Sequence, residues 1–274
     1  MDLGLAGSVA VVTGANNPEG IGAAIVEALA REGAHVCVPY LRLAPQAWGV
    51  DDASTSHAPG DSRYHAWRAE GHEHVDRRLR EQGLTANWLE LDLSADTAPD
   101  AVFDWAEQAA GPVSILVNNA AHFENNDRLI DLTADGISRT VAVNFRAALL
   151  LMGEFARRFK STGCTGRVIN ISTDAAQHFA GQVVYGSTKA AIEAATRAAA
   201  TELGPHGITV NAVAPGPVQT GYITDQAAAA LQGTIPLGRV GAPPDIADAA
   251  VFLASSRASW ITGQIIRVAG GHVM

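Results

Sequence analysis

The stretch VAVVTGANNPEGIG (residues 9–22) predicts a buried strand, a glycine-rich turn and the first turn of a helix. Val9–Val12 is a short apolar run, and residues 21–32 repeat apolar side chains at helical spacing before a glycine. Glycines let a turn approach a phosphate closely, and the N-terminus of the next helix offers N–H donors and partial positive charge. We therefore expect a nucleotide site that includes Gly14, Asn16, Gly20 and Ile21. An ordinary strand–helix turn is the alternative that this stretch leaves open.

The alternation of strand and helix continues along the chain. Short apolar runs predict further strands at residues 35–38, 87–91, 114–117, 167–171, 209–213 and 264–268. Helical spacing covers residues 133–160, 183–203 and 244–254. This pattern is typical of a parallel sheet covered on both faces, because right-handed crossovers return each helix onto the sheet. The predicted fold class is α/β, with a single doubly wound parallel sheet of the Rossmann type that forms one domain over residues 1–274.

Two segments depart from this alternation. Residues 42–86 are long for a connection between a strand and a helix and are rich in turn-forming residues. We expect a polar helix at about residues 62–82 and an ordered loop beside the second strand. Residues 220–238 are small and apolar, with four consecutive alanines at 227–230, and predict a mobile substrate lid.

The end of the second strand bears on the choice of cofactor. Its sequence, Val38-Pro39-Tyr40-Leu41-Arg42, lacks the carboxylate that holds the adenosine ribose of NAD(H). A ribose 2′-phosphate is therefore not repelled, and Arg42 is placed to pair with it. Tyr40 and Arg42 are candidate cofactor residues, and NADP(H) is favoured while NAD(H) stays open. The alternative for Arg42 is a side chain that only faces solvent.

Tyr185 and Lys189 stand four residues apart in a predicted helix, so both side chains lie on one face. A nearby ammonium stabilises tyrosinate, and this pairing would let Tyr185 exchange a proton with a substrate oxygen near neutral pH. Such a pair is common by itself and gains meaning only from other motifs.

Those motifs occur in a recognisable order. Asp92-Leu93 follows the third strand, Asn118-Asn119-Ala120-Ala121 follows the fourth, and Pro215-Gly216-Pro217-Val218-Gln219-Thr220 follows the sixth. Asn144 and Ser172 precede the Tyr185–Lys189 pair. Together with the glycine-rich turn, they resemble the short-chain dehydrogenase/reductase family in its single-domain form, and in particular members like the 3-oxoacyl-[acyl-carrier-protein] reductases. The resemblance covers about residues 5–271.

The resemblance implies a role for each matching position. Tyr185 would be the general acid or base, Lys189 would hold the nicotinamide ribose, and Asn144 would hold a water that links Lys189 to solvent. Ser172 would orient the substrate oxygen. The remaining cofactor-binding positions would be Asp92, Leu93, Asn119, Ala120, Pro215, Gly216, Val218 and Thr220.

Several positions have a second interpretation. Ser172 precedes Tyr185 by the expected 13 residues, but counting forward from Gly166 places the family's serine at Thr173. One residue reverses the side-chain direction in a strand, so only one hydroxyl points at the substrate, and we favour Ser172. Asn144 is alternatively a structural amide, and Asp92 a cap of the following turn.

The neighbouring positions carry expectations of their own. Asn118 is expected to tie strands together, and Thr220 is alternatively an N-cap. The turn also carries two extra residues, Pro18-Glu19, which bring a negative charge near the phosphates.

Composition excludes several classes of function. The net charge of −9 and the absence of clustered Lys and Arg argue against nucleic-acid binding. No apolar run is long enough to span a membrane, and no signal peptide is evident. Two cysteines, Cys37 and Cys164, suit a reducing cytoplasm rather than a disulfide framework. His72 and His74, two residues apart, do not share a helix face, so no metal site is expected.

The sequence thus predicts an oxidoreductase that moves a hydride between NADP(H) or NAD(H) and a carbonyl or secondary alcohol carbon of a small molecule. A catalytically silent dinucleotide-binding sensor or scaffold on the same fold is the alternative. Alanine-rich helices at residues 133–160 and 183–203 suggest burial against further copies, and the resemblance implies a homotetramer rather than a dimer.

Overall fold

A computed structural model describes residues 2–43, 59–159, 165–177 and 180–272. Its centre is a seven-stranded sheet with strand order β3-β2-β1-β4-β5-β6-β7, in which all neighbouring strands run parallel. The strands are β1 (Val9–Val12), β2 (His35–Tyr40), β3 (Ala86–Glu90), β4 (Ile115–Asn118), β5 (Gly166–Ile171), β6 (Ile208–Pro215) and β7 (Ile265–Val268). The order reverses between β1 and β4, so this sheet is the predicted doubly wound one, and a crevice is expected where those strands end.

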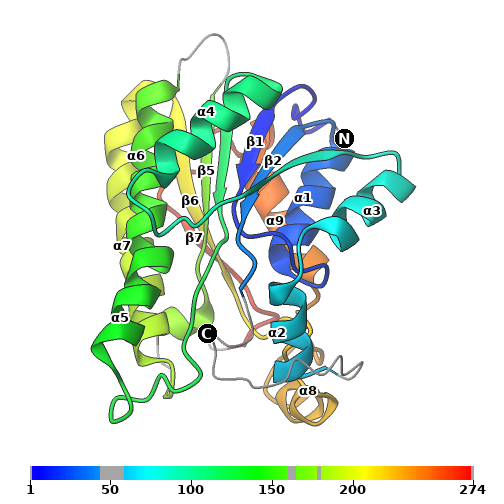
Figure 1. Ribbon diagram of the computed structural model, residues 1–274, viewed down its shortest axis with the longest axis vertical. Helices are drawn as coiled ribbons and strands as arrows, with labels where there is room; N and C mark the ends of the chain where they lie inside the picture. Colours follow the sequence, from blue (N-terminus) through cyan, green and yellow to red (C-terminus); the bar gives the residue numbers. More distant parts are fainter. Residues whose placement is uncertain (1, 44–58, 160–164, 178–179, 273–274) are drawn as a thin grey trace.

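Helices cover both faces of the sheet (Figure 1). One face packs against α1 (Ile21–Arg31) and α9 (Pro243–Ala254), which also contact each other. The other face packs against α4 (Ala98–Ala110), α6 (Ala148–Arg158) and α7 (Val183–Leu203). The central strands β1 and β4 are buried along their whole length, as their continuous apolar sequences require.

The structure refines the predicted helices. The stretch 133–160 is not one regular helix: α5 (Ala134–Val141) is joined to α6 through a π-helical turn at Ala142–Ala147. Helix α4 was not anticipated, although Pro99 near its start and the buried Val102, Phe103 and Ala106 follow helical spacing.

The segment 42–86 contains two helices instead of one, α2 (Asp61–Ala69) and α3 (Glu73–Glu81). They are separated at Gly71, where a side chain would meet the Glu73 carboxylate at 2.4 Å. The part of the expected loop at residues 44–58 lies outside the described residues. The segment 220–238, expected to form a lid, contains helix α8 (Asp225–Gln232), whose N-cap is Thr224.

Candidate active site

A cavity of about 320 Å³ lies where β1, β2, β4, β5 and β6 end. It is lined by most of the residues that the sequence analysis selected, and they come from segments far apart in the chain. These lining residues are Gly14, Asn16, Gly20, Ile21, Tyr40, Asp92, Leu93, Asn119, Ala120, Ser172, Tyr185, Lys189, Pro215, Gly216, Val218 and Thr220. Asn144 and Arg42 are the two selected residues that do not line it.

The glycine-rich turn packs directly against the segment that follows β4. Gly14 has a positive φ of +69°, and a Cβ there would lie 2.8 Å from the Cα of Ala120. Thr13 was not selected from the sequence, yet its buried hydroxyl accepts hydrogen bonds from the N–H groups of Asn119 and Ala120, at 3.0 and 2.9 Å. These contacts hold the two sides of the cavity together.

The two asparagines after β4 have structural contacts. The Asn119 amide donates to the carbonyls of Thr13 and Gly14, both at 2.9 Å. Asn118 donates to Oδ1 of Asn170 at 2.8 Å and so ties β4 to β5, as the sequence analysis expected.

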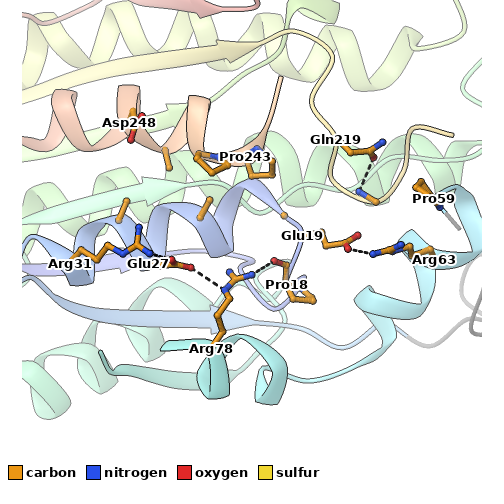
Figure 2. A pocket seen from close by; sticks show the side chains of 16 residues that line it. Pro18, Glu19, Glu27, Arg31, Pro59, Arg63, Arg78, Gln219, Pro243 and Asp248 are labelled. Atoms are coloured by element: carbon orange, nitrogen blue, oxygen red, sulfur yellow. Dashed lines mark hydrogen bonds and ion pairs between the residues drawn. The ribbon is translucent and has the colours of Figure 1, made fainter. Parts of the chain in front are cut away.

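The extra residues Pro18-Glu19 contact the insertion helices (Figure 2). The Glu19 carboxylate pairs with Arg63 of α2, and Arg78 of α3 donates to the carbonyl of Pro18 at 2.7 Å. Arg78 also pairs with Glu27 at 3.0 Å. The negative charge of Glu19 is therefore compensated, and a cavity of about 530 Å³ lies on this side of the turn. The charged residues at its wall pair mainly with one another.

Arg42 does not take the position expected for a 2′-phosphate ligand. Its exposed guanidinium binds both carboxylate oxygens of Glu90, at 2.9 and 2.7 Å, and it points along the edge formed by β2 and β3. Tyr40, by contrast, is buried, lines the cavity and hydrogen bonds with Nδ1 of His72 at 3.0 Å. The partner of Arg42 could not be foreseen because Glu90 lies 48 residues away.

Asp92 caps the turn after β3, since its Oδ1 accepts the N–H of Ser94 at 2.8 Å. It also lines the cavity next to the buried Leu93. The structural interpretation of Asp92 thus holds, and its position beside the cavity is compatible with the cofactor role as well.

The two candidate hydroxyls point in different directions. Ser172 donates to Oε1 of Glu193 on α7 at 2.8 Å. The Thr173 hydroxyl accepts the N–H of Ala175 at 3.2 Å and lies close enough to the Tyr185 phenol to lower its pKa. The preference for Ser172 as the substrate-facing hydroxyl is therefore not supported. Both residues line the cavity, and they differ in what their hydroxyls contact.

Tyr185 and Lys189 lie on one face of α7, with the ammonium 5.8 Å from the centre of the phenol ring. Burial raises the pKa of Tyr185, and the nearby Tyr64 and Asp174 raise it further; the hydrogen bond from Thr173 and the charge of Arg68 oppose this. Burial therefore dominates the pKa of Tyr185, and the expected lowering by Lys189 stays a prediction. Burial also lowers the pKa of Lys189 to about 8, while its Nζ donates to the carbonyl of Ile171 at 2.7 Å.

Asn144 is a buried connector in the π-helical turn. Its Oδ1 accepts the N–H of His122 at 2.7 Å, and its Nδ2 donates to the carbonyl of His122 at 2.8 Å and to the Thr188 hydroxyl at 3.1 Å. These contacts match the structural interpretation of Asn144. They join the segment after β4 to the helix position next to Lys189.

Asp127 is a site residue that the sequence analysis missed. It is buried, and its two carboxylate oxygens accept the N–H groups of Val184 and Tyr185. No local sequence motif predicts this contact, because Asp127 lies more than fifty residues before α7.

The segment after β6 closes the cavity. Asn17 donates to the carbonyl of Thr220 at 3.2 Å, and Gln219 donates to the carbonyl of Ile223 at 2.7 Å. The backbone at Thr220 is thereby tied to the glycine-rich turn. The N-cap of α8 is Thr224 and not Thr220, because the Thr224 hydroxyl accepts the N–H of Ala227 at 3.2 Å.

The residues considered for metal binding and redox chemistry have other partners. His72 contacts Tyr40, and His74 contacts Glu70 at 2.8 Å. Cys37 is a buried thiol whose pKa burial raises to about 11, and Cys164 lies outside the described residues. Within the described segments, no helix has the length and apolar character to cross a membrane.

The backbone and the shape of the cavity suit a dinucleotide. The backbone of the glycine-rich turn approaches so closely that a Cβ at Gly14 or Gly22 would collide with neighbouring atoms, at 2.8 and 2.5 Å. The cavity continues from this turn, past Tyr40 and Leu93, to Tyr185. These features are typical of a nucleotide-binding α/β protein, and a buried Tyr–Lys pair lies at the far end of the crevice.

Comparisons with known proteins identify the family. A family model described as enoyl-(acyl carrier protein) reductase matches residues 62–272. An uncharacterized oxidoreductase of Bacillus subtilis, YjdA, is 37 % identical over 97 % of this chain and 96 % of its own. The 3-oxoacyl-[acyl-carrier-protein] reductase FabG of Pseudomonas aeruginosa is 36 % identical over 99 % of this chain and 100 % of its own.

Solved structures agree with these relatives. A short-chain dehydrogenase/reductase of Serratia marcescens has a TM-score of 0.81 and 32 % identity, covering 98 % of this chain and 99 % of its own. A blue fluorescent protein from a metagenomic library, in complex with NADPH, has a TM-score of 0.79 and 29 % identity, covering 98 % of this chain and 99 % of its own.

The chain belongs to the short-chain dehydrogenase/reductase family and is an oxidoreductase that acts on the CH–OH or C=O group of its substrate with a nicotinamide dinucleotide. The alternative of a silent sensor gains no support from these relatives.

Proposed function

We propose that this protein reduces a carbonyl carbon, or oxidises the corresponding secondary alcohol, of a small molecule, with Tyr185 as general acid or base. The observation that carries the proposal is the contact between the Tyr185 phenol and the Thr173 hydroxyl, in the same cavity as the glycine-rich turn. Both hydroxyls face the same space, so one substrate oxygen can contact both of them. Thr173 replaces Ser172 in this proposal.

The bound dinucleotide supplies or accepts the hydride. Asn16 and Ile21 would offer backbone N–H groups to its phosphates at the N-terminus of α1. Gly14 and Gly20, whose own N–H groups bond to the carbonyls of Pro39 and Asn17, would let the backbone approach the phosphates closely. Tyr40, Asp92, Leu93, Asn119 and Ala120 would bind the adenosine part. Pro215, Gly216, Val218 and Thr220 would bind the nicotinamide, and Lys189 the adjoining ribose.

During reduction, the Tyr185 phenol donates its proton to the substrate oxygen while Thr173 holds that oxygen in place. Burial keeps Tyr185 protonated before the reaction. Lys189, whose pKa is lowered to about 8, is partly neutral just above neutral pH and is suited to pass a proton to Tyr185. Asn144 holds Thr188 and the segment at His122 around this pair, and a water relay through Asn144 stays part of the proposal.

We propose NADP(H) as the preferred cofactor, with NAD(H) as the second choice. The end of β2 presents no carboxylate to the cavity among the described residues that line it there, which are Pro39, Tyr40, Leu41 and Leu43. An NADPH complex among the similar structures and an NADPH-dependent aldehyde reductase of Arabidopsis thaliana among the relatives support this choice.

We further propose a cytoplasmic homotetramer. Apolar side chains of α5 and α6 are partly exposed, namely Ile137, Val141, Leu149 and Leu150. A second copy would cover them. Light scattering after size-exclusion chromatography tests the tetramer, and a dimeric mass contradicts it.

Nicotinamide absorbance tests the reaction. Purified protein is mixed with NADPH or NADH and a panel of ketones, diketones and 3-oxoacyl thioesters, beside Tyr185→Phe. We expect NADPH consumption to fall by roughly a hundredfold or more in the variant, because general acid catalysis is lost. Equal rates for both proteins would exclude Tyr185 as the proton donor.

A further inference from the structure

Helix α2 of the insertion crosses from the lid to the glycine-rich turn. The N–H of Gly60, which precedes α2, donates to the carbonyl of Gly221 at 2.8 Å. At the other end, Asn16 donates to the carbonyl of Glu70 at 3.0 Å. Figure 1 shows α2 beside α8 at one end of the molecule. The helix is therefore a strap that is fastened on both sides of the cavity.

The strap carries one arginine, Arg68, into the cavity. Arg68 is only 9 % exposed and lines the same space as Tyr185. Its Nη2 donates to the carbonyl of Ala121 at 3.2 Å, and its guanidinium lies 5.3 Å from the ring centre of Tyr64 and 5.7 Å from that of Phe123. A carbonyl and two aromatic rings thus hold the guanidinium in a fixed place.

The guanidinium lies beside the segment that packs against the glycine-rich turn. Ala121 follows Ala120, whose Cα is the atom that a Cβ at Gly14 would meet. Arg68 therefore lies next to the glycine-rich turn. Its backbone is near the end of β2, where its carbonyl accepts the N–H of Leu43 at 2.9 Å, but its side chain extends away from there to Ala121 and Phe123. This direction leads toward the middle of the cavity and away from the ribose end at Tyr40.

Local charge favours the same assignment. Among the described residues that line the cavity, the Lys and Arg side chains are Arg68 and Lys189. Lys189 is committed to the carbonyl of Ile171 beside Tyr185. The chain as a whole carries a net charge of −9. A local cation would favour a doubly negative pyrophosphate, and the planar fork of an arginine matches phosphate oxygens.

We propose that Arg68 binds the pyrophosphate of the nicotinamide dinucleotide from the strap side, opposite the N-terminus of α1. This assignment rests on the proposed function, and it gives the insertion a part in cofactor binding. Arg68 contacts the cofactor and leaves the proton transfer to Tyr185. The strap also links the cofactor to the lid, because its other end is bonded to Gly221.

Direct binding measurements test the proposal without turnover. Dissociation constants of NADPH and NADH are measured by calorimetry for the wild type, Arg68→Gln, Arg68→Lys and the matched control Arg77→Gln. Arg77 lies on α3, is exposed and does not line the cavity. We expect Arg68→Gln to weaken both dinucleotides by a similar factor of roughly ten to a hundred, and Arg68→Lys to weaken them less.

The outcomes separate this proposal from the proposed function. If the wild type binds and Arg68→Gln binds equally well, only the assignment of Arg68 is overturned. A loss confined to NADPH overturns the pyrophosphate site, because it places Arg68 at the 2′-phosphate. If the wild type binds neither dinucleotide, the proposed function fails together with the assignment.

A second measurement covers the case in which Arg68→Gln does not fold, which circular dichroism reveals. In the wild type, NADPH should slow amide hydrogen exchange across residues 61–69. Unchanged exchange in this segment, with NADPH bound, overturns the proposal.

Discussion

Asp127 caps the first turn of the helix that carries Tyr185. Its Oδ1 accepts the N–H of Val184 and its Oδ2 accepts the N–H of Tyr185, both at 2.8 Å. The first N–H groups of a helix have no partners within the helix, so a buried carboxylate at this point stabilises the helix start. Asp127 thus fixes the backbone from which the phenol projects.

Replacing Asp127 should affect both stability and activity. We expect Asp127→Ala to lower the free energy of unfolding by about 1–2 kcal/mol and to reduce kcat, because the first turn of α7 loses its cap. Urea denaturation and steady-state kinetics measure the two effects. Asp131→Ala is the matched control, since Asp131 is exposed, and an equal loss in both variants would contradict a specific role of Asp127.

The two hydroxyls after β5 should differ in their effect on activity. Thr173→Val is expected to reduce kcat by roughly a hundredfold, because it removes the hydroxyl that contacts Tyr185. It should also cost about 1 kcal/mol of stability, because the same hydroxyl accepts the N–H of Ala175. Ser172→Ala is expected to retain most activity and to lose about 1 kcal/mol of stability, because it removes the hydrogen bond to Glu193. The reverse pattern would restore Ser172 as the substrate-facing residue.

Lys189 should leave a signature in the pH dependence of stability. Burial lowers its pKa from 10.5 to about 8, so between these values the unfolded chain binds more protons than the folded one. The free energy of unfolding therefore rises with pH in this window, by about 1.4 kcal/mol per pH unit where the states differ by a full proton. Below pH 8, Lys189 is charged in both states and the cost of burying the charge is fully present.

Lys189→Met removes this contribution. Urea denaturation below and above pH 8 gives the free energy of unfolding of both proteins. Subtracting one from the other removes the contributions that they share, such as that of Cys37, whose raised pKa acts in the opposite direction. A parallel pH dependence of the two proteins would show that Lys189 has an ordinary pKa.

Arg42 should contribute little to the choice between cofactors. Its guanidinium already binds both carboxylate oxygens of Glu90 at the exposed edge of the sheet. We expect Arg42→Gln to change the ratio of the NADPH and NADH dissociation constants by less than about twofold, whereas loss of a 2′-phosphate ligand typically changes it by roughly tenfold or more. Fluorescence titration with both cofactors makes the measurement.

The ion pair between Glu19 and Arg63 should protect phosphate binding. Arg63→Gln leaves the Glu19 carboxylate uncompensated beside the glycine-rich turn, and we expect NADPH to bind roughly threefold more weakly. The double variant Glu19→Gln with Arg63→Gln should recover wild-type affinity. Failure to recover would mean that Arg63 acts through another contact.

Local features of the sequence predict those parts of the fold that depend on neighbouring residues. The strand, turn and helix at residues 9–32 follow from glycine positions and apolar spacing, and α7 begins and ends where the spacing of its side chains indicates. Helix α4 also has local signals, Pro99 and Val102 in its first turns, but the sequence analysis does not predict it.

Contacts between distant segments cannot be predicted from local sequence patterns. Arg68 meets Ala121 across 53 residues, and Arg42 meets Glu90 across 48. The choice between Ser172 and Thr173 depended on one residue of register at the end of β5, where the spacing from Tyr185 and the spacing from Gly166 disagreed. Only the path of the backbone resolves such a disagreement.

Because Pro18-Glu19 contacts α2 and α3, the two extra residues of the turn and the two helices depend on each other. A shorter relative that received only the two extra residues would acquire a bare carboxylate beside its phosphate site. A relative that received only the two helices would present Arg63 and Arg78 to a turn that lacks their acceptors. Successful transplantation of this cofactor site into another scaffold therefore requires both segments, which lie dozens of residues apart in the chain.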